Sequence, residues 1–475
     1  MIAFVRVKLL LVILTSFFVS LFLYNQSLNY YFFQDDFFEI NISKANSIGE
    51  YLSFFKFRND IIAYRPISLQ HYFFSTTSLF GLNPVAFRFI SFCLLFLSAF
   101  LIVKVIKKIT KNNTASVLAS FLWITSSIHF MSLSWIAAAY NIIGTFFWLL
   151  TATIFLKFLE TQKPRFYLLT IATFLLCVGS FEFSVTWPAI FIFYYFYMLK
   201  NPLTKAIILF SPFIVISTVY IILRLLFIKV PQITEYTTTL NIESAKAILW
   251  YILWSFNIPE EFKKQIVDNL IVFNPKFFSE YWPLVAKTFI SALLFILAAV
   301  IFPAVSLIRQ AKKLESRTIL FFLVWFFIGI LPVLLIPNHT FSMYLTLASI
   351  GIYGLISYLL SKTNFYVSLV VLAIWVFSSA TTISFYKINS WIVDTQKTAR
   401  KFSQDAPVQF PYLPTGSSLL YPLDSKFERQ ALLENHAIRT IYNDPSLSIY
   451  YNKESLISDW QKGKIKGSIY LYLPR

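Results

Sequence analysis

Apolar blocks of about 20 residues, with few or no charges inside them, recur along this 475-residue chain. About 20 residues is the length that an α-helix needs to cross about 30 Å of hydrocarbon at about 1.5 Å per residue. Hydrophobic residues make up 57% of the chain and charged residues 13%, against roughly 25% charged residues in an ordinary soluble domain. The sequence therefore predicts an all-α polytopic membrane protein and excludes a soluble fold.

The blocks predict a bundle of about eleven transmembrane helices. The first block follows Arg6 and Lys8, but it is too long for the core of a signal peptide and lacks a small-residue cleavage site, so we expect a retained helix. The expected spans are residues 8–29, 84–103, 114–129, 135–156, 166–181, 184–199, 205–228, 284–308, 318–336, 343–360 and 365–386.

The formal net charge of +18 comes largely from Lys and Arg residues in short loops. With a cytoplasmic N-terminus these basic loops alternate with less basic ones, as the positive-inside rule describes. The pattern predicts a multi-pass protein of the cell (inner) membrane in contact with membrane lipids, and argues against nucleic acid as a partner. The basic residues of the expected cytoplasmic loops are Lys104, Lys107, Lys108, Lys111, Lys157, Lys163, Arg165, Lys200, Lys205, Arg309, Lys312, Lys313, Arg317 and Lys362.

We expect two domains. Residues 1–386 form the transmembrane domain, with extracytoplasmic loops at 30–83 and 229–283, and residues 387–475 form a small extracytoplasmic α+β domain. The middle loop contains an apolar stretch at 245–256 that is too short to span and is expected to be an interfacial or re-entrant helix. The C-terminal segment is less apolar, richer in proline and mixed in charge, which predicts short strands such as 468–473.

An acidic segment lies where the first span is expected to reach the outer face. It contains Gln34, Asp35, Asp36 and Glu39. Carboxylates at a membrane boundary are costly to desolvate, so they normally serve a cation, a proton or a polar substrate, although a solvated helix end is the alternative. No cofactor is indicated with certainty, but the adjacent pair could hold a divalent cation. The sequence has no phosphate-cradling glycine loop, Cys/His metal spacing or nucleophile elbow.

Two further groups of residues are expected at the same face. Tyr64, Arg65 and His71 precede the second span and Arg88 lies near its outer end. An arginine can hold a phosphate with two parallel hydrogen bonds, whereas the alternative for Arg88 is interfacial snorkelling. Glu182 lies in a tight hairpin, where its side chain faces either water or a cavity among the helices, and we favour a functional role.

The remaining candidates are scattered over other outer connections. A lone histidine at such a boundary is more often a hydrogen-bonded structural residue than a functional one. Arg224 and Lys229 end the seventh expected span, where they could bind a phosphate or anchor the helix. The candidate substrate-binding residues in these connections are His129, Trp135, Tyr140, Asn141, His339 and Tyr344.

These clusters occur in an order that resembles a known family. The chain contains an acidic pair in YFFQDDFFEI, the segment YRPISLQHYFFSTTSLFGLNPVAFRFI, a His six residues before a Trp in SIHFMSLSWIAAAYN, a Glu six residues before Pro188, and MYLTLASIGIYG. Over roughly residues 1–360 it resembles membrane-embedded GT-C glycosyltransferases, in particular the branch of transmembrane and tetratricopeptide-repeat O-mannosyltransferases and their bacterial relatives. The repeat domain of that branch is absent. The chain departs from the family pattern at Met131, Ala139, Asn141, Phe181, Met343 and Ala348.

The resemblance implies transfer of a sugar from a polyprenyl-phosphate carrier to an acceptor glycan, lipid or protein on the outer face. Asp35 or Asp36 would be the general base, with Glu182 as a further catalytic carboxylate. The cations that would hold the donor phosphate are Arg65, Arg88, Arg224 and Lys229. A single-step displacement would invert the anomeric configuration, and the C-terminal domain is a candidate for selecting the acceptor. The alternatives are a transporter or flippase of lipid-linked sugars and an inactive relative that acts as an assembly partner.

Overall fold

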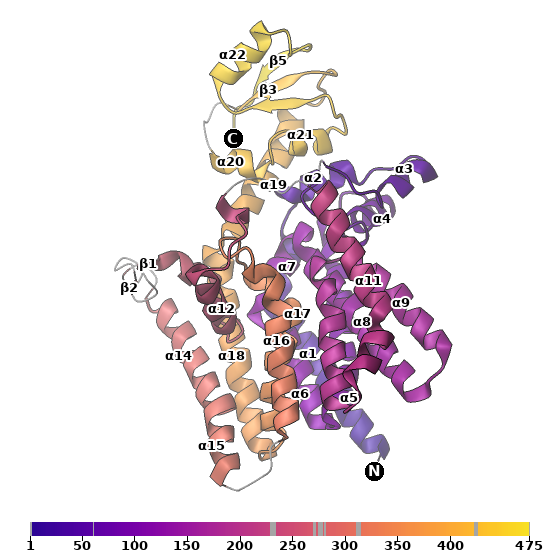
Figure 1. Cartoon of the computed structure of the whole chain (residues 1–475). Coiled ribbons are helices and arrows are strands. Elements are labelled where there is room, and N and C mark those ends of the chain that lie inside the picture. The colour runs from indigo at the N-terminus through magenta and orange to yellow at the C-terminus, as the bar shows by residue number, and fades with distance from the viewer. Residues whose placement is uncertain are drawn as a thin grey trace.

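The chain folds into a helical bundle with a small mixed domain at one end (Figure 1). The computed structural model describes residues 2–59, 61–228, 234–268, 272–273, 279, 282–309, 315–421 and 426–474. All eleven expected spans contain helix. Their helices are α1 (Ile2–Tyr24), α5 (Pro84–Thr110), α6 (Asn113–Ile124), α8 (Tyr140–Thr161), α9 (Pro164–Val178), α10 (Thr186–Phe193), α11 (Leu203–Phe227), α14 (Leu284–Ile296), α16 (Ser316–Leu334), α17 (Leu345–Leu360) and α18 (Phe365–Asn389).

Eight helical segments of the described residues are long and apolar enough to cross a membrane, or nine if one bent pair counts as a single span. This confirms the expected class, a multi-pass all-α membrane protein. α9 is a shorter apolar helix. The span expected over 184–199 is divided into the 3-10 helix η5 (Glu182–Val185), α10 and the π-helical turn η6 (Tyr194–Met198).

The helix expected over 114–129 ends early. α6 stops at Ile124, and the chain bends by 44° into η3 (Ser127–His129) and α7 (Phe130–Ser134). The run Thr125, Ser126 and Ser127 at the break competes with the helix for backbone hydrogen bonds. Side chains from distant helices satisfy the freed groups: Trp375 Nε1 donates to the Leu122 carbonyl at 3.1 Å, and the Tyr24 hydroxyl donates to the Ser126 carbonyl.

The first loop, which we expected only as an outer connection, is largely helical. It contains α2 (Asp35–Ile42), α3 (Ile48–Ser53), the π-helical turn η2 (Ile67–His71) and α4 (Tyr72–Phe80). The Ser47 side chain caps α3 by accepting from the Glu50 N–H at 3.2 Å. These short helices lie at the end of the bundle opposite the N-terminus (Figure 1). They were missed because none of them is long enough to stand out by apolar length.

The middle loop contributes η7 (Thr234–Tyr236), α12 (Ile242–Trp254), η8 (Glu260–Gln265), β1 (Ile266–Asp268) and β2 (Val272–Phe273). α12 confirms that the stretch expected at 245–256 is a helix of less than spanning length. Asn241 and Ser244 form a capping box at its start. α14 continues through the π-helical turn η9 (Leu297–Ile301) into α15 (Phe302–Arg309).

α16 and α17 approach each other closely. A Cβ atom at Gly351 would lie 2.5 Å from the Phe322 carbonyl oxygen and 2.8 Å from the Phe326 nitrogen, so only glycine fits there. The contact lies in the middle of α17, which follows the 3-10 turn η10 (Ser342–Tyr344).

The C-terminal segment forms the expected small α+β unit. Its sheet has the parallel order β4-β3-β5, with Leu419 paired to both Ile449 and Tyr470. α18 runs to Asn389, past the boundary that we expected at 387, and α19 follows it directly. The unit contains α19 (Trp391–Gln409), β3 (Ser418–Leu420), α20 (Lys426–Ala431), α21 (His436–Ile441), β4 (Ser448–Tyr450), α22 (Lys453–Gln461) and β5 (Ile469–Leu471).

Candidate functional site

The acidic segment forms the N-terminal turn of α2. Gln34, the N-cap residue, has φ 49° and ψ −127°, a conformation that residues with a Cβ rarely adopt. Asp36 is fully buried, and its two carboxylate oxygens accept the N–H groups of Phe33 at 3.1 Å and Ala137 at 2.7 Å. Burial raises the pKa of Asp36 to about 7, while Arg88 and the two N–H donors act to lower it. Asp36 therefore ties the turn to the 3-10 helix η4 (Ile136–Ala139).

Asp35 has a different environment from its neighbour. Its side chain is half-buried and accepts no hydrogen bond from the part of the chain that the structure describes. Burial raises the pKa of Asp35 to about 6, and the Arg65 cation opposes that rise. A carboxylate with a raised pKa and free oxygens beside a cation is suited to accept a proton.

Glu39 lies one helical turn beyond Asp35 and is also buried. The Gln70 side-chain amide donates to its Oε2 at 3.2 Å. Burial and the neighbouring carboxylates of Asp35 and Asp36 raise the pKa of Glu39 to about 8, against the lowering effect of Arg65. Three carboxyl groups therefore share one poorly hydrated region.

Arg65 and Glu182 form the cationic part of the site. Arg65 Nε donates to Glu182 Oε2 at 2.8 Å, and the guanidinium carbon lies 3.4 Å from the ring centroid of Tyr140. Burial acts to lower the pKa of Arg65, but Glu182 and Tyr140 outweigh it and hold that pKa above its usual value. Because the hydrogen bond to Glu182 uses Nε, both terminal nitrogens of the guanidinium remain as donors. Glu182 also has an unpaired buried Oε1 among the described residues.

A second arginine approaches the same carboxylate from α11. Burial acts to raise the pKa of Glu182, but the cations of Arg65 and Arg224 hold it below its ordinary value. The buried Nε of Arg224 and the hydroxyl of Tyr220 have no hydrogen-bond partner within the described residues. Tyr64 lies beside Tyr220, with ring centroids 6.2 Å apart, and its hydroxyl donates to the Phe55 carbonyl at 2.9 Å.

Aromatic rings close the other side of the site. Tyr344 lies beside Tyr140, and His339 lies between Tyr236 at 4.6 Å and Phe341 at 4.9 Å, measured between ring centroids. Burial and the Asp35 carboxylate raise the pKa of Tyr236. Burial and Arg65 lower the pKa of His339 to about 4. The sequence did not reveal Tyr236 as a candidate, because a single tyrosine in a polar loop belongs to no recognisable motif.

Arg88 lies inside the protein, where its charge acts to lower the pKa of Asp36. Its side chain is 1% exposed, and its terminal nitrogens donate to the carbonyls of Tyr30 at 2.5 Å, Pro84 at 3.2 Å, Tyr31 at 3.3 Å and Ser134 at 2.9 Å. Arg88 therefore links three parts of the backbone: the segment before α2, the start of α5 and the end of α7. Lys229, the other cation that we expected beside Arg224, lies outside the described residues.

Four further candidates contact protein groups. His129 is fully buried and its Nε2 pairs with the Trp123 carbonyl at 2.8 Å, whereas His71 Nδ1 pairs with the Tyr51 hydroxyl at 3.0 Å. Asn141 is buried and donates to the Ala138 carbonyl at 3.0 Å. Trp135 stacks on Phe33, next to the acidic segment, with 6.1 Å between ring centroids.

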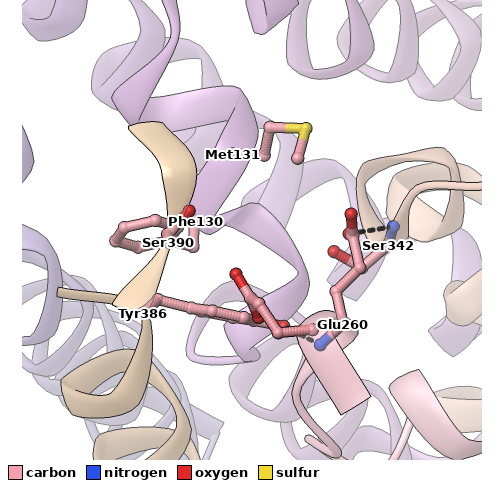
Figure 2. Close-up of a pocket in the computed structure, with 7 residues that line it drawn as sticks. Phe130, Met131, Glu260, Ser342, Tyr386 and Ser390 are labelled. Carbon is pink, nitrogen blue, oxygen red and sulfur yellow. Dashed lines mark hydrogen bonds between the residues drawn. The ribbon is translucent and has the colours of Figure 1, made fainter. Parts of the chain in front are cut away.

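A small pocket lies beside Ser342, the first residue of η10. It is lined by Phe130, Met131, Glu260, Glu261, Ser342, Tyr386 and Ser390. Figure 2 shows Glu260 directed at Ser342, whose N–H donates to Glu260 Oε2 at 2.7 Å. The Glu260 N–H donates to the Tyr386 hydroxyl at 2.9 Å. Glu260 therefore supports the turn that carries Tyr344, a role that its position in a long loop did not reveal.

The site contains no obvious metal-binding group. Across the ranges that the structure describes, no three or more His, Cys, Asp or Glu side chains are grouped to hold a metal ion. Both oxygens of Asp36 already accept backbone hydrogen bonds, and Asp35 faces a guanidinium, so this pair is a poor match for a divalent cation.

The chain was compared with known protein families, curated proteins and solved structures. No family model matches the chain, and no curated protein matches it by sequence. The ArnT of Cupriavidus metallidurans bound to undecaprenyl phosphate is similar at 11% identity and a TM-score of 0.46, covering 98% of this chain and 89% of that one. The oligosaccharyltransferase AglB of Archaeoglobus fulgidus, in complex with an inhibitory peptide and a dolichol-phosphate, is similar at 12% identity and a TM-score of 0.49, covering 95% of this chain and 65% of that one.

The archaeal enzyme tethered with an acceptor peptide containing the NVT sequon is similar at 12% identity and a TM-score of 0.49, covering 94% of this chain and 64% of that one. This chain thus spans just under two thirds of the length of the archaeal enzyme. These structural neighbours are an ArnT and an oligosaccharyltransferase, and at this low identity they assign no family to the chain.

Proposed function

We propose that the chain is an integral membrane glycosyltransferase that moves a sugar from a polyprenyl-phosphate carrier to an acceptor on the extracytoplasmic face. The observation that carries the proposal is the pairing of Asp35, a carboxylate with free oxygens and a raised pKa, with Arg65, an arginine whose terminal nitrogens remain as donors. Transfer of a glycosyl group needs both parts: a base for the acceptor proton and a cation for the departing phosphate.

The structure favours Asp35 over Asp36 as the base. Asp36 is fully buried and both its oxygens accept backbone N–H groups, so protonating it would weaken bonds that hold the turn. Asp35 is half-buried and can receive a proton without that loss. Asp36 then acts as a positioning residue for Asp35. The sequence alone did not distinguish which of the two is the base.

The cations of the site are suited to the leaving group. As the bond between the anomeric carbon and the phosphate oxygen breaks, the electron pair passes to the phosphate, which gains negative charge. Arg65, with Arg224 nearby, would stabilise that charge. Glu182 holds the Arg65 side chain in place through Nε, so we assign it a positioning role rather than a proton-transfer role.

In the proposed step the acceptor oxygen attacks the anomeric carbon as its proton passes to Asp35. One carbon–oxygen bond forms as the other breaks, which inverts the anomeric configuration and needs no covalent sugar–enzyme intermediate. Aromatic side chains such as Tyr140, Tyr344 and His339 would line the sugar site. A covalently bound sugar on Asp35 would contradict this step.

The membrane orientation belongs to the same proposal. We infer from the positions of the basic loops that the N-terminus lies in the cytoplasm and that the acidic turn and the C-terminal domain lie outside. The carrier lipid would enter from the bilayer beside α11, whose outer end carries Arg224. Membrane-impermeant labelling of single cysteines introduced near Asn443 and near Lys111 tests the orientation, because only the former should react from outside.

The decisive experiment measures transfer or hydrolysis of radiolabelled sugars from a panel of polyprenyl-phosphate donors by the purified protein. Asp35→Asn should abolish turnover and retain donor binding, whereas Asp394→Asn, at a side chain that is 69% exposed, is the matched control. Turnover that survives in both Asp35→Asn and Asp36→Asn would show that the base is misassigned. Donor binding without turnover in the native protein would favour a transporter or an inactive assembly partner.

A further inference from the structure

The C-terminal domain contacts the acidic segment directly. α21 packs on α2, and the two elements lie together at the same end of the bundle (Figure 1). The Phe38 ring meets the His436 ring edge-on at 5.2 Å between centroids, and Lys44 Nζ donates to Asn443 Oδ1 at 2.7 Å. On the other side of the turn, Trp391 of α19 packs against Phe33 with 6.0 Å between ring centroids. The domain therefore contacts both flanks of the acidic turn.

One of these contacts falls on the residue before Asp35. The Gln34 N–H donates to the carbonyl of Ala431 at 2.9 Å, at the end of α20. Gln34 also has the unfavourable backbone conformation with φ 49° and ψ −127°. A strained residue keeps its conformation only where its surroundings hold it, and here part of that support comes from the C-terminal domain.

A second contact fixes the other end of α2. The side-chain amide of Asn41 lies 2.9 Å from the His436 carbonyl, 3.0 Å from Thr440 Oγ1 and 2.9 Å from the Phe37 carbonyl. It therefore joins the last turn of α2 to α21. Nothing in the sequence marks Asn41, which lies in a polar stretch after the acidic residues.

We infer that the C-terminal domain is a positioning part of the active site, and that Asn41 and the Gln34 backbone are the residues through which it holds Asp35 beside Arg65. This rests on the proposed function and gives the domain a task other than selecting an acceptor. Positioning of a base matters because a displacement of about 1 Å can cost about a hundredfold in rate. The domain contacts the turn through Gln34 and α2 through Asn41, and is not proposed to contact the reacting atoms.

The test compares turnover and pH profile in the full-length protein, with the panel donor that the native chain uses. Asn41→Ala should lower kcat by about tenfold to a hundredfold, with KM for the donor within about twofold of the native value. A loosened turn lets water reach Asp35, so the acidic limb of the profile should move to lower pH. The charged and titratable groups that face Asp35, which must remain in place, are Asp36, Glu39, Arg65 and Tyr236.

A rescue experiment separates positioning from general damage to the fold. Gln34→Gly in the Asn41→Ala background should restore part of kcat, because glycine adopts the required conformation without help and keeps the N–H that binds Ala431. Asn452→Ala is the matched control, since Asn452 caps α22 in the same domain without a contact to α2. If Asn41→Ala fails to fold, Thr440→Val, which removes one acceptor of the Asn41 amide, replaces it.

The outcomes distinguish this inference from the proposed function. Native kcat and an unchanged pH profile in both Asn41→Ala and Thr440→Val, with turnover lost in Asp35→Asn, would overturn the positioning role and leave the glycosyltransferase assignment standing. Turnover that persists in Asp35→Asn would overturn the assignment of Asp35 as the base, and donor binding without turnover in the native protein would overturn the glycosyltransferase assignment itself. A loss in Asn41→Ala that Gln34→Gly does not relieve would show that strain at the turn is not what the domain supports.

Discussion

Arg65 and Glu182, 117 residues apart in sequence, share a hydrogen bond of 2.8 Å from Nε to Oε2. The pair joins the segment that follows the acidic turn to the hairpin between α9 and α10. Neither residue would tolerate this partly buried position alone, because an unpaired charge there is costly. The pair therefore brings together the segment that contains Arg65 and the hairpin that contains Glu182, which the sequence analysis treated as separate candidates.

Arg65→Lys should lower kcat/KM by about a hundredfold or more, because a lysine keeps the charge but loses the second donor and the stacking on Tyr140. Arg429→Lys is the matched control: Arg429 Nε also pairs with a glutamate, Glu434, at 2.7 Å, but the pair is more than half exposed. Steady-state kinetics with the panel donor measures both. Equal effects in the two variants would show that Arg65 has no special role in transfer.

The pH dependence of kcat/KM should have an acidic limb near the raised pKa of Asp35, about 6. The sign follows from the role: the base must be ionised, so turnover rises as pH increases through that value and falls below it. An ordinary exposed aspartate would place the limb near pH 4. Kinetics between pH 4.5 and 8 in a constant-ionic-strength buffer is the measurement, and a flat profile over that range would count against Asp35.

Glu39→Gln should reduce the loss of stability as pH rises. The pKa of Glu39 in the folded chain is about 8, above its ordinary value of 4.5, so the folded state binds the extra proton between these values. Stability contributed by this group is present below the lower value and is lost as pH rises through the upper one. The unfolding midpoint of the native protein should therefore fall more steeply from pH 5 to 8 than that of Glu39→Gln, with the exposed Glu454→Gln as control.

Arg88→Gln should damage the fold rather than donor binding. The side chain donates to four carbonyls from three parts of the chain. Leaving the two buried ones, those of Tyr30 and Ser134, without donors costs about 1–3 kcal/mol each. The thermal midpoint should drop markedly, whereas KM for the donor should change little in whatever protein remains folded. Arg165→Gln, at an exposed position, is the control. An unchanged thermal midpoint with a raised KM for the donor would support the earlier expectation that Arg88 binds the donor phosphate.

Turnover should persist in excess EDTA, because arginines and not a bound cation would stabilise the leaving phosphate. The measurement is transfer before and after dialysis against the chelator. Activity lost on chelation and recovered with Mg²⁺ or Mn²⁺ would show that the acidic turn holds a metal after all.

The apolar blocks determined most of the fold, because the length of a membrane crossing is a property of each segment alone. The same reasoning found α12 as a helix shorter than a span. It missed the break after Ile124, where the alternative partners of the freed backbone groups come from α1, α18 and the middle loop. A local pattern cannot show whether distant side chains will satisfy a broken helix.

The sequence by itself determined that carboxylates and arginines gather in the loops expected at one face, since charges are excluded from the blocks between. Only the tertiary structure decided their roles. It paired Arg65 with Glu182, left Asp35 half-buried, and buried Asp36, whose carboxylate accepts two backbone N–H groups. It also turned Arg88 and His129 toward carbonyls of the interior. The physical reason is that hydration and hydrogen-bond partners set the chemistry of a charged group, and both depend on residues far away in the chain.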